Sequence, residues 1–222
     1  MPGPAWGEDS QADERTIAAN VAELLKHLLT VAPARRPPSV SLAHEWHRII
    51  YRDVASVPAA HYLGTPRGST DPDLVDYEVV LRNSVTGEVV AHGVAAAHVE
   101  RALDTFATSL TVAVASLDEA IAPNRPPHTK NELLAVVELA AVAHGEWVRI
   151  HPYANGNGRT ARVWANWVAM RYGLPPFVRI KPRPDGLLYA QAAQRSMGLA
   201  PDFASDHDLT IAVFLDLLRQ RP

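Results

Sequence analysis

Cysteine is absent from all 222 residues, so the chain can form no disulfide bond, no thiolate zinc site and no cysteine nucleophile. Long apolar runs are missing as well, because none approaches the roughly 18 residues that a membrane-spanning helix needs. The first residues, MPGPAWGEDSQADER, are polar and acidic and lack the basic and then apolar order of a secretion signal. From these absences we expect a cytoplasmic protein without a membrane partner.

Positive charge is scarce too. The formal net charge is −3, and no stretch of the sequence forms a basic stripe, so a nucleic acid partner and a helical DNA-binding module are disfavoured. Of the 21 cationic residues, only Lys26, Lys130 and Lys181 are lysines. An excess of arginine can indicate recognition of phosphate groups, although codon bias in a GC-rich genome produces it as well. The positions of individual arginines must decide between these explanations.

Helical periodicity is what the chain has most of. Hydrophobic residues make up 47% of the sequence, and the length suits one domain with a real hydrophobic core. Apolar residues at i, i+3 and i+4 predict helices over residues 16–29, 41–52, 95–120, 132–149, 159–172, 186–197 and 208–219. We expect Trp147, Trp164 and Trp167 to lie in the core between these helices.

The chain has one convincing strand signal. Tyr77, Val79 and Leu81 alternate with their neighbours, residues 83–87 form a turn pattern, and a short strand pattern returns at residues 88–90. A single hairpin is too small to be a fold by itself, so it must pack on helices or extend from them. We therefore predict an all-α protein with one inserted β-hairpin.

Two histidines in the predicted helix 41–52 come close to the zinc-protease pattern HExxH. The segment His44-Glu45-Trp46-His47 is one residue too short for that pattern. Since histidines at i and i+3 with no third ligand make a poor metal site, we interpret both as surface or packing residues.

The most informative segment is residues 150–162, IHPYANGNGRTAR. One helix ends just before it and another begins at about Arg159, and glycines before a helix N-terminus let backbone N–H groups form an anion-binding nest. Arg159 and Arg162 share one face of the next helix, close to a dipole end that disfavours cations. That cost disappears if a polyphosphate sits between the two guanidinium groups, since each can make bidentate contacts to phosphoryl oxygens.

His151 lies at the other end of this loop. An imidazole with an ordinary pKa of about 6.5 can act as a general base at neutral pH, and a base across a loop from a phosphate cradle suggests group transfer to a hydroxyl. The sequence has no GxxxxGK pattern, so this is not a P-loop. The structural alternative is a His-Pro helix stop followed by a turn with two surface arginines. The histidine, the glycines and the two arginines all occur at the spacing that a phosphate site with a base requires, which favours the functional interpretation.

Residues 151–162 resemble the Fic-domain signature, HPFx(D/E)GNGRxxR, with Tyr153 at the usual phenylalanine. The similarity covers roughly residues 40–200. Before the signature, the matching parts are an early helix at 42–51, a glycine-to-arginine loop at 64–67, a β-hairpin flap at 77–90 and a helix from 95 onward. After it, a late helix at 183–193 with Tyr189 also matches. The resemblance implies a Fic-type helical bundle with one inserted β-hairpin flap. It divides the chain into an N-terminal helical arm and linker, 1–38, and a Fic-type catalytic domain, 39–222.

The resemblance further implies transfer of AMP from ATP to a Ser, Thr or Tyr hydroxyl of a target protein. His151 would deprotonate the attacking hydroxyl. Phosphate binding would fall to five residues of the signature, which are Gly156, Asn157, Gly158, Arg159 and Arg162. Of these, Arg162 would neutralise the γ-phosphate. The flap would align the target segment by strand-like main-chain pairing.

Asn155 departs from the family pattern, in which an Asp or Glu at this position holds Mg²⁺. Mg²⁺ prefers anionic oxygen ligands, and an amide oxygen can ligate but lacks the charge. Three outcomes are open: a weaker Mg²⁺ site, a site completed by the nucleotide phosphates, or altered substrate choice. We expect ATP and Mg²⁺ to be required, with a greater need for Mg²⁺ than in the family.

Family members are often restrained by a helix with the pattern (S/T)xxxE(G/N), whose Glu pairs with the second arginine of the signature. Ser10 and Glu14 have this spacing, as do Ser41 and Glu45, but neither Glu is followed by Gly or Asn. Such spacings arise readily by chance in a charged helix. Inhibition by an antitoxin-like partner in trans therefore stays open beside self-inhibition.

Two other functions also stay open. The signature contacts phosphates rather than the base, so UTP, GTP or a diphosphate-linked donor is compatible with it. Alternatively, the neutral side chain of Asn155 would make the chain a nucleotide-binding regulator that does not transfer.

Overall fold

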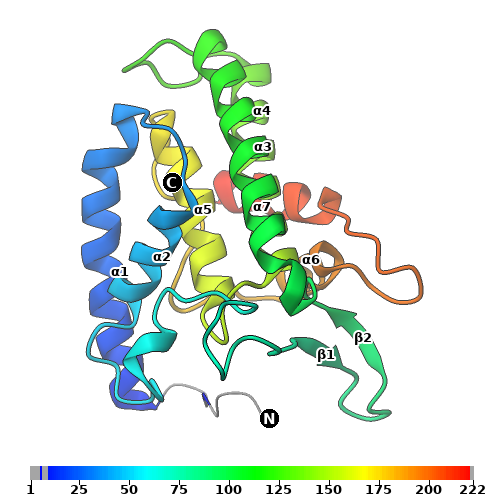
Figure 1. The fold of residues 1–222 in the computed structure, drawn as a ribbon. Helices are drawn as coiled ribbons and strands as arrows, with labels where there is room; N and C mark the ends of the chain where they lie inside the picture. Colours follow the sequence, from blue (N-terminus) through cyan, green and yellow to red (C-terminus); the bar gives the residue numbers. More distant parts are fainter. Residues whose placement is uncertain (1–5, 7–9, 221–222) are drawn as a thin grey trace.

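The computed structural model describes Trp6 and residues 10–220, and it is a helical bundle from which one hairpin extends (Figure 1). The predicted all-α fold with one inserted β-hairpin is confirmed. The helices are α1 (Gln11–Val31), α2 (Val40–Ile50), α3 (Val99–Ala120), α4 (Lys130–Ile150), α5 (Asn157–Arg171), α6 (Leu187–Met197) and α7 (Asp208–Arg219). Short 3₁₀ turns occur at Ala32–Ala34, Ala60–Tyr62 and Ala96–His98.

Helix α4 forms the centre of the bundle and packs against α3, α5, α6 and α7. Thr129 caps its first turn by accepting a hydrogen bond from the Glu132 N–H. Its small residues allow close approach: a Cβ at Gly145 would lie 2.4 Å from Nδ1 of His207, so any side chain there would clash. The small-residue face that the sequence shows in this segment therefore serves helix packing.

Aromatic rings fill the space between α4 and its neighbours. Trp147 and Trp164 are fully buried, and both rings contact Phe106 of α3 at centroid distances of 5.4 and 5.3 Å. Trp46 of α2 contacts Trp164 edge-on at 4.7 Å. Together with the buried Trp167, these rings confirm that the tryptophans are core residues.

Helix α1 begins earlier than apolar periodicity predicts, because Ser10 and Asp13 form a capping box ahead of the first apolar residue. The helix packs against α2 and α5, and its apolar stripe joins the common core through Ile17, Val21, Leu24 and Leu28. This extra turn at the start of α1 carries Glu14 toward the N-terminal end of α5. The division of the chain at residue 38 stays a prediction.

The hairpin is displaced from the predicted one: β1 (Val80–Arg82) begins after Tyr77 and β2 (Val89–His92) ends beyond residue 90, and the two strands pair antiparallel. The carbonyl of Val79 still accepts a hydrogen bond from the Gly93 N–H, but that of Tyr77 accepts from Arg67 instead of from the second strand. The outer edge of β2 meets a second segment, in which the Ala200 N–H donates to Val90. Within the described part of the chain, no helix combines the length and the apolar character needed to cross a membrane.

Candidate active site

The loop between α4 and α5 is closed by its own side chains. His151 ends α4 in the left-handed conformation, with φ 53°, and its N–H donates to the carbonyl of Trp147. Asn157 then bridges the loop, because its Oδ1 accepts from the Tyr153 N–H at 2.8 Å and its Nδ2 donates to the Tyr153 carbonyl at 2.7 Å. This pair of hydrogen bonds ties the loop to the first residue of α5.

Gly156 starts α5 at a position that only glycine suits. Its φ is +82°, and a Cβ there would lie 2.5 Å from the ring of Tyr51 and 2.9 Å from Nε2 of His47. No side chain among the described residues caps the first turn of α5. The first N–H groups of this helix therefore face a ligand position in the way that an anion site requires.

His47 supports the loop from α2. It is fully buried, its Nε2 lies 3.0 Å from the carbonyl oxygen of Asn155, and its Nδ1 lies 3.0 Å from the N–H of Gly64. Since the carbonyl only accepts and the N–H only donates, the ring is neutral with its proton on Nε2. Burial accordingly lowers the pKa of His47 to about 3. His47 is thus a packing residue, as one of the two interpretations expected.

Tyr153 also has a partner that explains its difference from the family's phenylalanine. Its ring is fully buried at 4.1 Å from that of His47, and its hydroxyl lies 2.8 Å from Nδ1 of His44. A buried hydroxyl without a partner would destabilise the fold. His44 therefore makes the substitution tolerable.

The signature residues surround one cavity of about 550 Å³ at the N-terminal end of α5. Every residue that the sequence nominated for the site lines it: His151, Asn155, Gly156, Asn157, Gly158, Arg159 and Arg162. Glu14, Ala154, Lys181, Pro182 and Arg183 complete the lining. The structure thus brings all nominated residues together, while their individual roles stay predictions.

The two arginines of the signature are held differently. Arg159 donates to the hydroxyl of Tyr51 and lies over that ring, 5.4 Å from its centroid. Arg162 is only 7% exposed and donates to the carbonyl of Ile180 and, at 3.1 Å, to the hydroxyl of Tyr189. Arg162 belongs to the second turn of α5, but helix side chains lean toward the N-terminus, so it still reaches the cavity.

His151 has the protonation state that a base needs. Its Nδ1 lies 3.2 Å from the carbonyl oxygen of Val148, which can only accept, so the proton sits on Nδ1 and Nε2 keeps its lone pair. Burial is the main cause that lowers the pKa of His151 to about 4, and the positive charge of Arg67 adds to it. The imidazole is neutral at physiological pH and ready to accept a proton at Nε2.

Sequence reasoning gave Glu14 little weight and did not place Lys181 or Arg183 in the site. The carboxylate of Glu14 pairs with Nζ of Lys181 at 3.1 Å across the cavity wall. Lys181 is one of three lysines in the chain, and that rarity was the only signal for it. By contrast, Glu45 is exposed on α2 and does not line the cavity.

The cavity offers few oxygen ligands for a metal ion. Oδ1 of Asn155 already accepts a hydrogen bond of 2.6 Å from the Gly156 N–H, and the carboxylate of Glu14 is paired with Lys181. An amide oxygen retains a second lone pair, so Asn155 can be at most one neutral ligand. A divalent ion here would depend on oxygens that the ligand itself brings.

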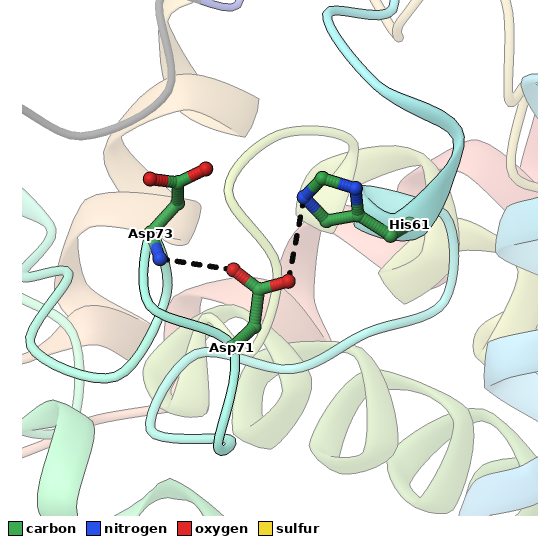
Figure 2. Close-up of side chains that lie close together, drawn as sticks. All are labelled: His61, Asp71 and Asp73. Atoms are coloured by element: carbon green, nitrogen blue, oxygen red, sulfur yellow. Dashed lines mark hydrogen bonds and ion pairs between the residues drawn. The ribbon is translucent and has the colours of Figure 1, made fainter.

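A second cluster with metal-ligand chemistry lies outside the cavity, in the loop before the hairpin. Figure 2 shows His61, Asp71 and Asp73, whose ligand atoms lie within 4.8 Å of one another. Asp71 bonds to His61 and to the Asp73 N–H, and Asp73 accepts from the hydroxyl of Tyr62 at 2.7 Å. Both carboxylates thus have partners within the loop, and we assign the cluster to bracing it.

Comparison with known proteins gives a family match over most of the bundle. A family model described as the Fic/DOC family matches residues 38–169. A protein adenylyltransferase Fic from Nematostella vectensis is 44% identical over 63 residues, which is 28% of this chain and 15% of that protein. The protein adenylyltransferase fic-1 of Caenorhabditis elegans is 50% identical over 42 residues, or 19% of this chain and 8% of that protein. The chain therefore matches only a short part of these relatives.

Solved structures share the fold over nearly the whole chain. A Fic domain containing signalling protein from Bacteroides thetaiotaomicron has a TM-score of 0.63 at 24% identity, covering 96% of this chain and 72% of that one. BepC from Bartonella tribocorum, solved with bound AMPPNP, has a TM-score of 0.53 at 14% identity, with 90% and 86% covered. At these identities the likeness establishes the fold.

Proposed function

Because the chain belongs to the Fic/DOC family, we propose that it is a protein adenylyltransferase that moves AMP from ATP to a Ser, Thr or Tyr hydroxyl of a target protein. The observation that carries the proposal is the single cavity in which a neutral imidazole, an uncapped helix N-terminus and two guanidinium groups meet. The names of the matching relatives support AMP as the transferred group. The AMPPNP bound to BepC supports a nucleotide as the ligand of this fold.

The reaction needs one proton acceptor and neutralisation of a polyphosphate. The target hydroxyl oxygen attacks the α-phosphorus while its proton passes to Nε2 of His151. The bond from the α-phosphorus to the bridging oxygen breaks, and pyrophosphate leaves. The Gly156 N–H donates to Asn155, so the backbone N–H groups of Asn157 and Gly158, with Arg159, bind phosphate oxygens, and Arg162 neutralises the terminal phosphate. Positioning and electrostatic stabilisation supply most of the rate in such a displacement.

We expect Mg²⁺ to enter the cavity bound to the phosphates of the nucleotide. Asn155 would be a neutral side-chain ligand for the ion, a weaker donor than the carboxylate of the family signature. When bound, the ion would neutralise part of the charge of the leaving pyrophosphate.

Restraint of the activity has two candidate sources. Glu14 lies on the cavity wall and pairs with Lys181, so in cis it could compete with a terminal phosphate for cationic partners. An antitoxin-like partner in trans is the alternative carried over from the family pattern, since Glu14 is followed by Arg15 rather than by Gly or Asn. The position of Glu14 at the cavity favours restraint in cis.

The test is donor labelling. The purified chain is incubated with a cell lysate and with ATP, UTP or GTP labelled at the α-phosphate, in parallel with His151→Ala. We expect labelled protein bands with ATP, none with His151→Ala, and nucleotide affinity in that variant within about threefold of the wild type. If only UTP or GTP gives labelled bands, that nucleotide and not ATP is the donor. If nucleotide binds but no band is labelled, the chain is a nucleotide-binding regulator.

A further inference from the structure

Arg67 lies in the loop between α2 and the hairpin, outside the cavity, and its side chain is completely buried. Its guanidinium donates to four backbone carbonyls: those of His151 at 2.7 Å, Tyr77 at 2.8 Å, Val94 at 2.8 Å and Ile150 at 3.1 Å. The Arg67 N–H adds a bond of 2.6 Å to the carbonyl of Pro152. Nη1 also lies 3.6 Å from the carboxylate of Glu78, which begins the hairpin side of the loop. Burying a guanidinium costs free energy, and only a fixed geometry with all these partners makes it favourable.

These acceptors belong to two functional parts of the molecule. His151 and its neighbours form the end of α4, where the proposed base stands in a left-handed conformation. Tyr77 precedes β1 and Val94 follows β2, so they are the two stems of the hairpin. One side chain thus ties the entry and the exit of the hairpin to the backbone of the histidine.

Gly93 makes the same connection from the hairpin side. Its N–H donates to the carbonyl of Val79 at 3.0 Å, which closes the base of the hairpin. A Cβ at Gly93 would lie 3.0 Å from Cβ of His151 and 3.1 Å from Nη2 of Arg67. The exit stem, the guanidinium and the histidine therefore touch one another with no room for a methyl group.

We propose that Arg67 is a positioning residue that joins the hairpin and His151 into one unit, so that a target segment held along the hairpin is placed in register with Nε2 of the histidine. The role of Arg67 in placing a target rests on the proposed transferase function. The contacts that join the hairpin to His151 do not depend on that function. Arg67 does not line the cavity, so it would act through the backbone of His151 and of the hairpin stems.

The first test replaces the planar fork and keeps the charge. In Arg67→Lys, a compact ammonium with three donors cannot reach carbonyls in three segments, as a guanidinium with five donors can. We expect kcat to fall by about 100-fold, because a misplacement of about 1 Å costs roughly that factor, and KM for the target to rise. Nucleotide affinity should stay within about twofold, since Arg67 does not line the cavity.

The matched control is Arg171→Lys. Arg171 is also a buried arginine, 3% exposed, that donates to a backbone carbonyl, that of Arg36 at 2.8 Å. It lies at the far end of α5, about 14 Å beyond Arg162, the last residue of the signature, at 1.5 Å per residue. Any loss that comes only from disturbing a buried arginine should appear equally in both variants.

A second variant covers the case in which Arg67→Lys unfolds. Gly93→Ala leaves Arg67 in place but forces His151 or the guanidinium to move by a few tenths of an ångström. We expect a fall in kcat with unchanged nucleotide affinity and a melting temperature near that of the wild type. If Gly93→Ala and a folded Arg67→Lys both transfer at the wild-type rate, the proposal is overturned.

A readout independent of transfer separates this proposal from the proposed function. The imidazole of His151 is followed by NMR during a pH titration of the wild type and of both variants. A changed titration midpoint for His151 in Arg67→Lys supports the linkage even if the wild type transfers nothing, a result that would remove the proposed function alone. If the titration midpoint of His151 and kcat are both unchanged in Arg67→Lys and Gly93→Ala, the proposed role of Arg67 is wrong while the proposed transferase function stands.

Discussion

The two ends of helix α5 hold a buried arginine in different ways. At the C-terminal end, Arg171 is 3% exposed and pairs with the carboxylate of Asp118. At the N-terminal end, Arg162 is 7% exposed, and its partners are the carbonyl of Ile180 and the hydroxyl of Tyr189. Among the residues that the structure describes, no carboxylate pairs with Arg162.

This difference separates a structural arginine from one that is available to a ligand. A buried charge is stabilised when a carboxylate neutralises it, as Asp118 does for Arg171. Neutral acceptors hold the guanidinium of Arg162 in place but leave its charge uncompensated beside the positive end of the α5 dipole. An anion in the cavity would neutralise the charge of Arg162, whereas Asp118 already neutralises that of Arg171.

The largest effect should come from removing the cavity arginine. Arg162→Gln is expected to lower kcat/KM for AMP transfer by about 1000-fold, because it removes a charge that stabilises the phosphates in the transition state. The free energy of unfolding should fall by only about 1 kcal/mol, since no carboxylate is left unpaired and the amide of Gln can still donate to one of the acceptors of Arg162. Steady-state kinetics and urea denaturation measure the two quantities.

Arg171→Gln is the matched variant at the other end of α5. It removes the closer of the two arginines that pair with the partly buried Asp118 and leaves Arg35 at 3.5 Å, so we expect a loss of about 2 kcal/mol in unfolding free energy and transfer within about threefold of the wild type. If the two variants behave alike in both assays, the comparison between the two ends of α5 is wrong.

We expect low pH to destabilise the N-terminal end of α5 before its C-terminal end. Burial lowers the pKa of His47 and His144 to about 3 each, from the ordinary value of 6.5. The unfolded chain thus binds more protons between pH 6.5 and about 3, so this stability is complete above pH 6.5 and is lost as the pH falls. The slope is about 1.4 kcal/mol per pH unit for each fully neutral histidine.

Urea denaturation at pH 7.5 and pH 5.0 measures this loss. Because His47 supports the carbonyl of Asn155, amide hydrogen exchange at Gly156 should accelerate at pH 5.0, relative to the intrinsic rate, more than exchange at Tyr172 beyond the other end of α5. His47→Gln should reduce the pH dependence of the unfolding free energy. An unfolding free energy that is flat between these pH values would contradict the neutral state of both histidines.

A smaller effect concerns the metal. Asn155→Asp keeps the acceptor for the Gly156 N–H and adds a negative charge, so we expect the Mg²⁺ concentration for half-maximal transfer to fall by about tenfold, equivalent to about 1.4 kcal/mol. A Mg²⁺ titration of both proteins at fixed ATP measures it. An unchanged midpoint would mean that position 155 does not contribute to the ion.

The smallest effect should come from Glu14. Glu14→Gln removes the ion pair with Lys181 on the cavity wall, and we expect self-modification to rise by about threefold, a change of less than 1 kcal/mol. Glu23→Gln is the control in the same helix, because Glu23 also forms an ion pair, with Arg52, but does not line the cavity. A rise in both variants would point to the net charge of α1, and no rise would favour an inhibitor in trans.

Local pattern was sufficient for the elements of this fold and for the residues of the signature. Helical spacing and caps lie within a few residues of each other, so the bounds of α7 agree with the prediction and those of α2 differ by at most two residues. The signature could be found for the same reason, since His151, Gly156 and Arg162 lie within one loop and the two turns that follow it. The start of β1 was misplaced, because Tyr77 satisfies its carbonyl through Arg67, a contact that no strand periodicity contains.

What only the tertiary structure decided is which distant residues meet that loop. Arg67 reaches across 84 positions to the carbonyl of His151, and Glu14 reaches across 167 to Lys181. The supporting hydrogen bond from His47 to Asn155 is of the same kind. The physical reason is that backbone conformation follows neighbours in sequence, whereas a buried charge or a carbonyl is satisfied by any partner that helix packing brings within hydrogen-bond distance.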